Sequence, residues 1–204
     1  MTQQEFKTLI DKYTEVISQI RESAHALHAG VNQTYDDVHP YGFHLDMVAD
    51  SVYKYGHVVC SREKDVVPLF FGAYYHDSIE DARQTYNDVK RIAKRWMDDE
   101  QALMATELVY ALTNEKGRTR AERANEKYYQ GIRETAYAPF VKLADRLANI
   151  THSFSHNNAE NVHMKQTYLK ELPHFINAID AGNADMRHIL PKGMIRAIED
   201  ITRQ

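Results

Sequence analysis

Apolar residues recur with a helical period along most of the chain. Between Phe6 and Ile20 they fall at the i, i+3, i+4 and i+7 spacing of an amphipathic first helix, and the helical stretch that follows ends at Gly30. The strict alternation of apolar and polar residues that is typical of β-strands is almost nowhere present. The pattern therefore predicts an all-α fold.

The same periodicity places the remaining helices. The second is expected to stop at Gly56, Asn87 and Asp88 look like an N-cap pair, and Pro68 is the main local conflict with helix. Turn-forming residues precede Pro40, and a charged linker follows Leu112. The predicted helices run from about Tyr41 to Tyr55, Glu63 to Asp81, Asn87 to Trp96, Asp98 to Leu112, Tyr137 to Phe154, Val162 to Ile179 and Lys192 to Thr202.

Length and composition limit how these helices are organised. The chain has 204 residues, of which 43% are hydrophobic, so it can form one good core. No internal repeat and no low-complexity segment interrupts it. We expect a single domain over residues 1–204, in which the segment after residue 160 adds extra C-terminal helices to one helical bundle.

Charge and cysteine content exclude several classes of protein. A formal net charge of −4 provides no global positive field for a nucleic-acid polymer, so any phosphate-bearing partner must be small and locally bound. Cys60 is the single cysteine, which rules out an intrachain disulfide and fits a reducing cytoplasm. There is no leader-like N-terminus and no run of about 18 apolar residues. These features predict a soluble cytoplasmic protein that does not bind a membrane.

Four ionisable side chains follow the apolar run from Val66 to Ala73. They are His76, Asp77, Glu80 and Asp81. On a helix, His76 and Glu80 are four residues apart, as are Asp77 and Asp81, so each pair projects from one side. If this segment is buried, each charge costs several kcal/mol (roughly) unless a partner compensates it. The sequence therefore raises the question of what that partner is.

Two further polar positions suggest a divalent metal as the partner. Asp145 interrupts the apolar stripe of the helix predicted from Tyr137, and His44 lies on the helix predicted from Tyr41. Two imidazoles and two carboxylates from three helices would suit a first-row ion such as Mn, Fe, Co or Zn. Each residue alone has an ordinary alternative: a surface His–Asp pair or helix-end cap, an ordinary histidine, or an ion-pair face of Asp145 with Lys142 and Arg146.

Three blocks of sequence carry a resemblance to a known family. They are PYGFHLDMVA, YYHDSIEDA and VKLADRLANI. They resemble motifs of the HD-domain metal phosphohydrolases, and in detail those of the stringent-response hydrolase domain and its small stand-alone relatives that cleave guanosine tetraphosphate. The resemblance covers about residues 20–155, and Leu45 departs from the usual proline of the first block.

The resemblance implies roles for individual residues. It implies one divalent ion, usually Mn²⁺, with His44, His76, Asp77 and Asp145 as its ligands. It also implies that Glu80 and Asp81 handle the attacking water and that Asn149 lies near the substrate. Of the two acids, Glu80 is the first choice as general base, because a carboxylate beside the ion can accept the proton of that water.

Substrate contacts are predicted mainly from basic residues. The family carries a basic pair before the first block, where this chain has Tyr35 and Asp36, and Tyr35 is a candidate to stack on a base. Five basic residues cluster in the charged linker and are candidates to hold distal phosphates, although a solvated linker is the ordinary alternative. Lys142 and Arg146 are further candidates. The linker residues are Lys116, Arg118, Arg120, Arg123 and Lys127.

Three functions from different classes follow. The first is a metal-dependent pyrophosphohydrolase that removes the 3′-pyrophosphate of guanosine 3′,5′-bis(diphosphate) or a close analogue. The second is a nucleotidase that releases orthophosphate from nucleoside 5′-monophosphates. The third is a non-catalytic nucleotide-binding protein, against which the presence of all ligand and acid residues counts. The partner common to all three is a small phosphorylated nucleotide.

Overall fold

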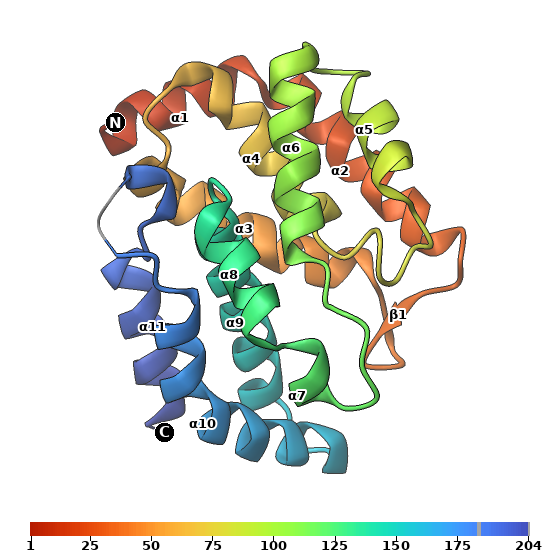
Figure 1. The fold of residues 1–204 in the computed structure, drawn as a ribbon, viewed down its shortest axis with the longest axis vertical. Helices are drawn as coiled ribbons and strands as arrows, with labels where there is room; N and C mark the ends of the chain where they lie inside the picture. The colour runs from red at the N-terminus through yellow and green to blue at the C-terminus, as the bar shows by residue number, and fades with distance from the viewer. Residues whose placement is uncertain (183–184, 204) are drawn as a thin grey trace.

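The computed structural model describes residues 1–182 and 185–203, and its architecture is all-α with one two-stranded hairpin (Figure 1). The elements are α1 (Gln3–Lys12), α2 (Thr14–Ala29), β1 (Thr34–Tyr35), β2 (His39–Pro40), α3 (Gly42–Val59), η1 (Glu63–Asp65), α4 (Val66–Tyr75), α5 (Tyr86–Ala93), α6 (Asp99–Leu112), α7 (Arg120–Arg123), α8 (Glu126–Glu134), α9 (Ala138–Ser155), α10 (Ala159–Ile179), η2 (Met186–His188) and α11 (Lys192–Thr202). The predicted fold class is confirmed.

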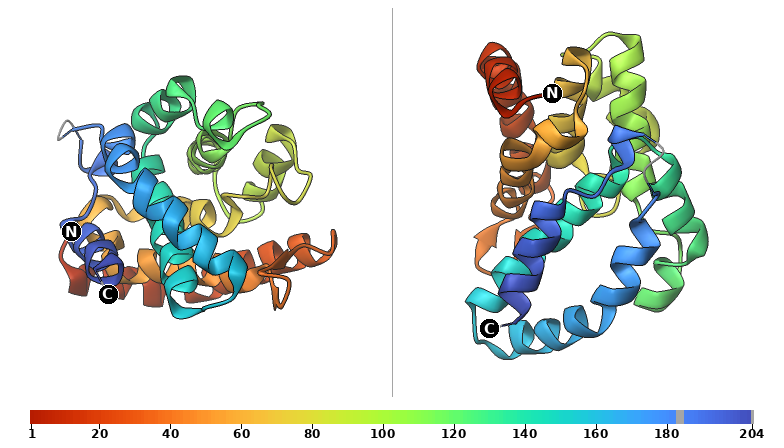
Figure 2. Two further views of the ribbon diagram at one scale, coloured as in Figure 1. Left: turned by 90° about the horizontal axis from the view of Figure 1, so that it is seen from below. Right: turned by 90° about the vertical axis from the view of Figure 1, so that its left-hand side faces the viewer.

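Helices α4 and α9 organise the packing. Every residue of α4 is buried, and the helix packs against α2, α3 and α6. Helix α9 packs against α3, α10 and α11, and the right-hand view of Figure 2 shows α11 running beside it. A helix that is apolar on all sides must lie inside the molecule, so the sequence around α4 sets the centre of the core. Pro68 is compatible with α4 because it lies in the first turn, where no backbone N–H is needed.

The N-terminal helices differ from the prediction at two places. The first predicted helix is divided at Tyr13 into α1, which packs against α3, and α2, which packs against α3 and α4. Gly56 does not end the second helix, since α3 continues to Val59. A Cβ at Gly56 would overlap the ring of Phe6, so this glycine permits the close approach of α1 to α3.

Helix starts are governed by capping side chains. Helix α6 begins as predicted, with Asp98 accepting a hydrogen bond from the backbone of Gln101 at 2.9 Å. The predicted Asn87–Asp88 cap is wrong: Thr85 caps α5, and Asp88 completes a reciprocal capping box with it. Helix α8, which was expected to be part of the charged linker, begins after Asn125 and buries three apolar side chains.

The hairpin between α2 and α3 was not predicted. Tyr35 pairs with His39 across an antiparallel register, and Asp36 and Asp37 adopt left-handed backbone angles between them. Aspartate tolerates this conformation better than most residues, which explains the two acids in the turn. Among the described residues, no helix combines the length and the apolar character that crossing a membrane requires.

Candidate metal centre

Two buried imidazoles, on different segments of the chain, face each other. His44 lies on α3 and His76 follows the end of α4, and each is only 2% exposed. Their Nε2 atoms are 3.2 Å apart. The Oδ1 atom of Asp145, on α9, lies 3.4 Å from the Nε2 of His44 and 3.9 Å from that of His76. His44, His76 and Asp145 thus offer three ligand atoms within 4.8 Å of one another, which could hold a metal ion.

Asp77 lies against the same two imidazoles. Its Oδ2 is 2.9 Å from the Nε2 of His76 and 3.6 Å from the Nε2 of His44. The structure therefore brings together all four residues that the sequence proposed as ligands. They come from α3, α9 and the turn after α4, rather than from three helices.

The predicted continuation of helix to Asp81 is wrong, and His76 provides the reason. Helix α4 ends at Tyr75, and residues 76–81 form turns, followed by a bend at Ala82. The Nδ1 atom of His76 lies 2.9 Å from the carbonyl oxygen of Ala73. In a continuous helix that carbonyl would accept from the backbone of Asp77, so the imidazole competes with the helical ladder. A proton on Nδ1 then leaves the Nε2 lone pair directed at the site.

Neighbouring donors keep the carboxylate of Asp145, on α9, in its ionised form. Lys142 donates to Asp145 Oδ2 at 3.0 Å, and the side-chain amide of Asn149 donates to Oδ1 at 2.6 Å. Burial alone would raise the pKa of Asp145, but Lys142 and the two imidazoles reverse this effect and hold the pKa well below its ordinary value. Asp145 is therefore ionised at neutral pH.

The four groups together attract positive charge. Burial lowers the pKa of His76, but Asp77 and Asp145 overcome this effect and raise it to about 9. A divalent ion would supply the same compensation without a proton. The donor set of two imidazole nitrogens and two carboxylates fits Mn, Fe, Co or Zn, and the His76–Ala73 contact is of the kind that orients metal-ligating histidines.

Tyr41 connects a candidate ligand to a candidate acid. Its hydroxyl lies 2.5 Å from Asp77 Oδ2 and 3.0 Å from Asp81 Oδ2. Glu80 accepts hydrogen bonds from the backbone and the side chain of Asn114, at the start of the linker. Desolvation and the nearby Asp77 charge raise the pKa values of both Glu80 and Asp81. A raised pKa makes a carboxylate a better proton acceptor at neutral pH.

The cluster opens onto a cavity of about 660 Å³, which we call the polar cavity. His44, Asp77 and Asp145 form part of its wall, together with Glu80 and Asp81. Six of its lining side chains are carboxylates and four are cations, so the wall has an excess of negative charge unless a metal ion is bound. Aromatic side chains from α8 and α10 complete the lining. The cavity is large enough for a small phosphorylated molecule.

The predicted substrate residues divide into two groups. Those in the lining of the polar cavity are Arg120, Arg123, Lys142, Arg146 and Asn149. Those outside it are Tyr35, Lys116, Arg118 and Lys127. Tyr35 donates to Asn149 Oδ1 at 2.9 Å, and its ring centre lies 5.0 Å from that of His44. Tyr35 therefore packs against a candidate ligand instead of lining the cavity. Lys127 forms an ion pair with Glu115 at 2.8 Å.

Helix α10 contributes lining residues that sequence reasoning missed. Tyr168, Glu171 and Phe175 follow one another at spacings of three and four, which places them on one face of the helix. His174, for which the sequence offered no role, lines the cavity beside them. That spacing was a usable signal, but the sequence does not show that this face turns toward Asp145.

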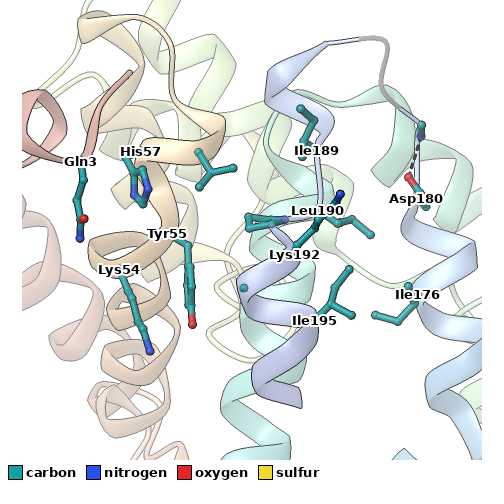
Figure 3. A pocket seen from close by; sticks show the side chains of 14 residues that line it. Gln3, Lys54, Tyr55, His57, Ile176, Asp180, Ile189, Leu190, Lys192 and Ile195 are labelled. Carbon is teal, nitrogen blue, oxygen red and sulfur yellow. Dashed lines mark hydrogen bonds between the residues drawn. The ribbon is translucent and has the colours of Figure 1, made fainter. Parts of the chain in front are cut away.

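A second cavity, of about 770 Å³, lies between α3, α10 and α11 (Figure 3). Ile176, Ile189, Leu190 and Ile195 supply much of its wall, and the figure shows Tyr55 on the opposite side. We call it the apolar cavity. It shares no lining residue with the polar cavity.

No protein-family model matches the chain, and no curated protein matches it. The function is therefore inferred from the residues, their sequence motifs and their geometry.

Proposed function

We propose that this protein is a metal-dependent phosphohydrolase that acts on a small phosphorylated nucleotide. One observation supports it above all: two buried imidazoles with Nε2 atoms 3.2 Å apart are flanked by Asp77 and Asp145, and His44 and both carboxylates line a cavity whose wall also carries arginines. A bound divalent ion would lower the pKa of a water molecule and offset the charge on a phosphoryl group. The resemblance of the three sequence blocks favours Mn²⁺.

The residues divide the work by position. His44, His76, Asp77 and Asp145 are the proposed ligands. Glu80 is the first candidate to accept the proton of the attacking water, because it lines the cavity and its pKa is raised. Asp81 is the second candidate, and the hydroxyl of Tyr41 holds its carboxylate beside Asp77. Lys142 keeps Asp145 ionised.

A guanosine polyphosphate is our first proposal for the substrate. The sequence blocks support it by resemblance, and Arg120, Arg123 and Arg146 in the cavity wall provide donors for phosphate oxygens. The predicted reaction is release of pyrophosphate from the 3′ position.

One observation favours the nucleotidase alternative. Of the four cations in the lining, Arg120 and Arg146 are paired with Glu171, and Lys142 is paired with Asp145. Within residues 1–182 and 185–203, only Arg123 among them has no ion-pair partner. A single phosphate needs fewer cations than a tetraphosphate, so a nucleoside monophosphate remains a competing substrate.

A substrate screen tests the proposal. Protein purified without chelator is assayed with Mn²⁺ on guanosine tetraphosphate, its adenine counterpart and nucleoside monophosphates, and pyrophosphate and orthophosphate are measured separately. Pyrophosphate from a polyphosphate supports the first substrate, and orthophosphate from monophosphates alone supports the second. Absence of bound metal, together with a melting temperature that does not change on adding Mn²⁺, would contradict the proposal, because ligand binding must stabilise the native state.

A further inference from the structure

Two arginines of the polar cavity share the carboxylate of Glu171. Arg120 donates from Nε to Oε1 at 2.7 Å and from Nη2 to Oε2 at 3.1 Å, which is a two-pronged contact. Arg146 donates from Nη1 to the same Oε2 at 2.9 Å. Two guanidinium groups from different helices, α7 and α9, thus converge on one small anion. Proteins also bind phosphate groups with paired guanidinium donors of this kind.

The three side chains differ in how firmly they are held. Arg146 is 8% exposed, and its guanidinium carbon lies 4.2 Å from the ring centre of Phe175 and 4.9 Å from that of Tyr168. Arg120, on the four-residue α7, is 49% exposed, and Glu171 is 30% exposed. The buried guanidinium of Arg146 is held between two aromatic rings, whereas the partly exposed carboxylate of Glu171 regains hydration when it turns toward water.

Charge favours replacement of this carboxylate by a phosphate. The three groups carry a formal charge of +1, and the two arginines alone carry +2. A phosphate carries up to two negative charges and more acceptor oxygens than a carboxylate, so it can accept from both guanidinium groups at once. Glu171 belongs to the same wall as the candidate metal centre, so a ligand held there is within the same cavity.

We propose that Arg120 and Arg146 form a second anion subsite for a phosphate group remote from the metal centre, and that Glu171 fills this subsite until such a ligand displaces it. The subsite deepens the proposed function, since it rests on a substrate that carries more than one phosphate group. Glu171 is then an internal competitor. The apparent affinity for the phosphate ligand equals the intrinsic affinity multiplied by the fraction of molecules in which Glu171 leaves the arginines free.

Binding of inorganic pyrophosphate to metal-free protein tests the subsite without requiring hydrolysis. Calorimetric titration at fixed salt compares the wild type with Glu171→Gln, which retains the side-chain shape but removes the charge. Removal of the competitor is expected to tighten pyrophosphate binding at least about tenfold. Glu160→Gln, at the start of the same helix and outside the cavity, is the matched control and should bind like the wild type. Adding Arg120→Ala to Glu171→Gln should abolish the gain.

The opposite result identifies Glu171 as a structural tie between α7 and α10. In that case Glu171→Gln binds pyrophosphate no more tightly than Glu160→Gln, and its melting temperature falls. If Glu171→Gln does not fold, Glu171→Asp is titrated instead, because a carboxylate shorter by one methylene should also compete less well. The titration and the substrate screen are independent, since a failed screen leaves the titration unaffected and a failed titration leaves hydrolysis unaffected.

Discussion

The polar cavity and the apolar cavity have similar volumes but opposite linings. The first, of about 660 Å³, is lined by six carboxylates and four cations. The second, of about 770 Å³, has three isoleucines, a leucine, a valine and a proline in its lining, with one carboxylate and two lysines. Helix α10 separates them, with Phe175 on one side and the adjacent Ile176 on the other. Volume alone would therefore select the cavity that lacks the clustered imidazoles and carboxylates.

The difference teaches that the free-energy cost of burying the lining side chains is a better guide to a functional site than cavity volume is. Apolar side chains around a cavity need no partner, whereas a buried carboxylate or imidazole must be paired, or the fold loses several kcal/mol (roughly). Beside the polar cavity, His44, His76, Asp77 and Asp145 come together in spite of this cost. A divalent ion would account for that arrangement, and the apolar cavity contains no comparable feature among the described residues.

The largest expected effect comes from removing one ligand charge in the polar cavity. Asp145→Asn should lose metal and phosphohydrolase activity together, with metal affinity weakened by at least about 100-fold, because even the loss of an outer partner of a ligand costs 10- to 100-fold. Metal content is measured by elemental analysis after purification without chelator, and folding is checked by circular dichroism.

Asp180→Asn is the matched change in the apolar cavity. Asp180 accepts a hydrogen bond from the backbone of Gly182 at 2.8 Å, so its replacement affects only a loop contact. Metal content should stay at the wild-type level. Equal metal loss in both variants, or none in Asp145→Asn, would remove the contrast between the two cavities and the ligand assignment with it.

A smaller effect is expected from Glu80→Gln. The variant should keep its metal, because Glu80 interacts with Asn114 rather than with the imidazoles, while kcat falls about 100-fold, as expected for loss of a general base. The control is Glu126→Gln, another carboxylate of the cavity wall, which should change kcat less than about twofold on the same principle. Unchanged turnover in Glu80→Gln would transfer the role to Asp81.

Much of the fold could be predicted from periodicity, and its errors have physical causes. The amphipathic helices α6, α9, α10 and α11 lie close to their predicted ranges, because their apolar stripes face the core. Helix α8 was missed because charged residues surround the short run that buries Tyr128, Tyr129 and Ile132. The pairing of His76 with the carbonyl of Ala73 shortens α4, and spacing alone cannot show such a competition.

The candidate site was predictable where chemistry is concentrated in short motifs. His44, His76, Asp77 and Asp145 converge as the sequence proposed. The positions of the basic linker residues were harder to predict. Residues at similar spacing point in different directions because Lys127 pairs with Glu115 and Arg120 pairs with Glu171. These pairings join segments 12 and 51 positions apart, and no local rule predicts the second.

A third prediction concerns the basic residues of the linker. Arg123→Ala should raise KM about tenfold, because Arg123 lines the polar cavity and a hydrogen bond to a charged group contributes about 1.5 to 3 kcal/mol. Arg118→Ala should leave KM unchanged, since Arg118 is outside the lining. Steady-state kinetics on guanosine tetraphosphate measure both. Equal effects would show that charge in the linker, rather than position in the wall, governs substrate binding.

The smallest effect is expected from filling the apolar cavity. Ile189→Phe places a larger side chain in a space of about 770 Å³, so the ring can be accommodated without overpacking. The free energy of unfolding should rise by roughly 0.5 to 1 kcal/mol, as cavity-filling changes commonly do, while kcat, KM and metal content stay at wild-type levels. Thermal unfolding and steady-state kinetics are the measurements. Adding a ring to the polar cavity by Ala121→Phe should instead raise KM. If Ile189→Phe changes kcat or KM as strongly as Ala121→Phe does, α10 couples the two cavities and they do not act independently.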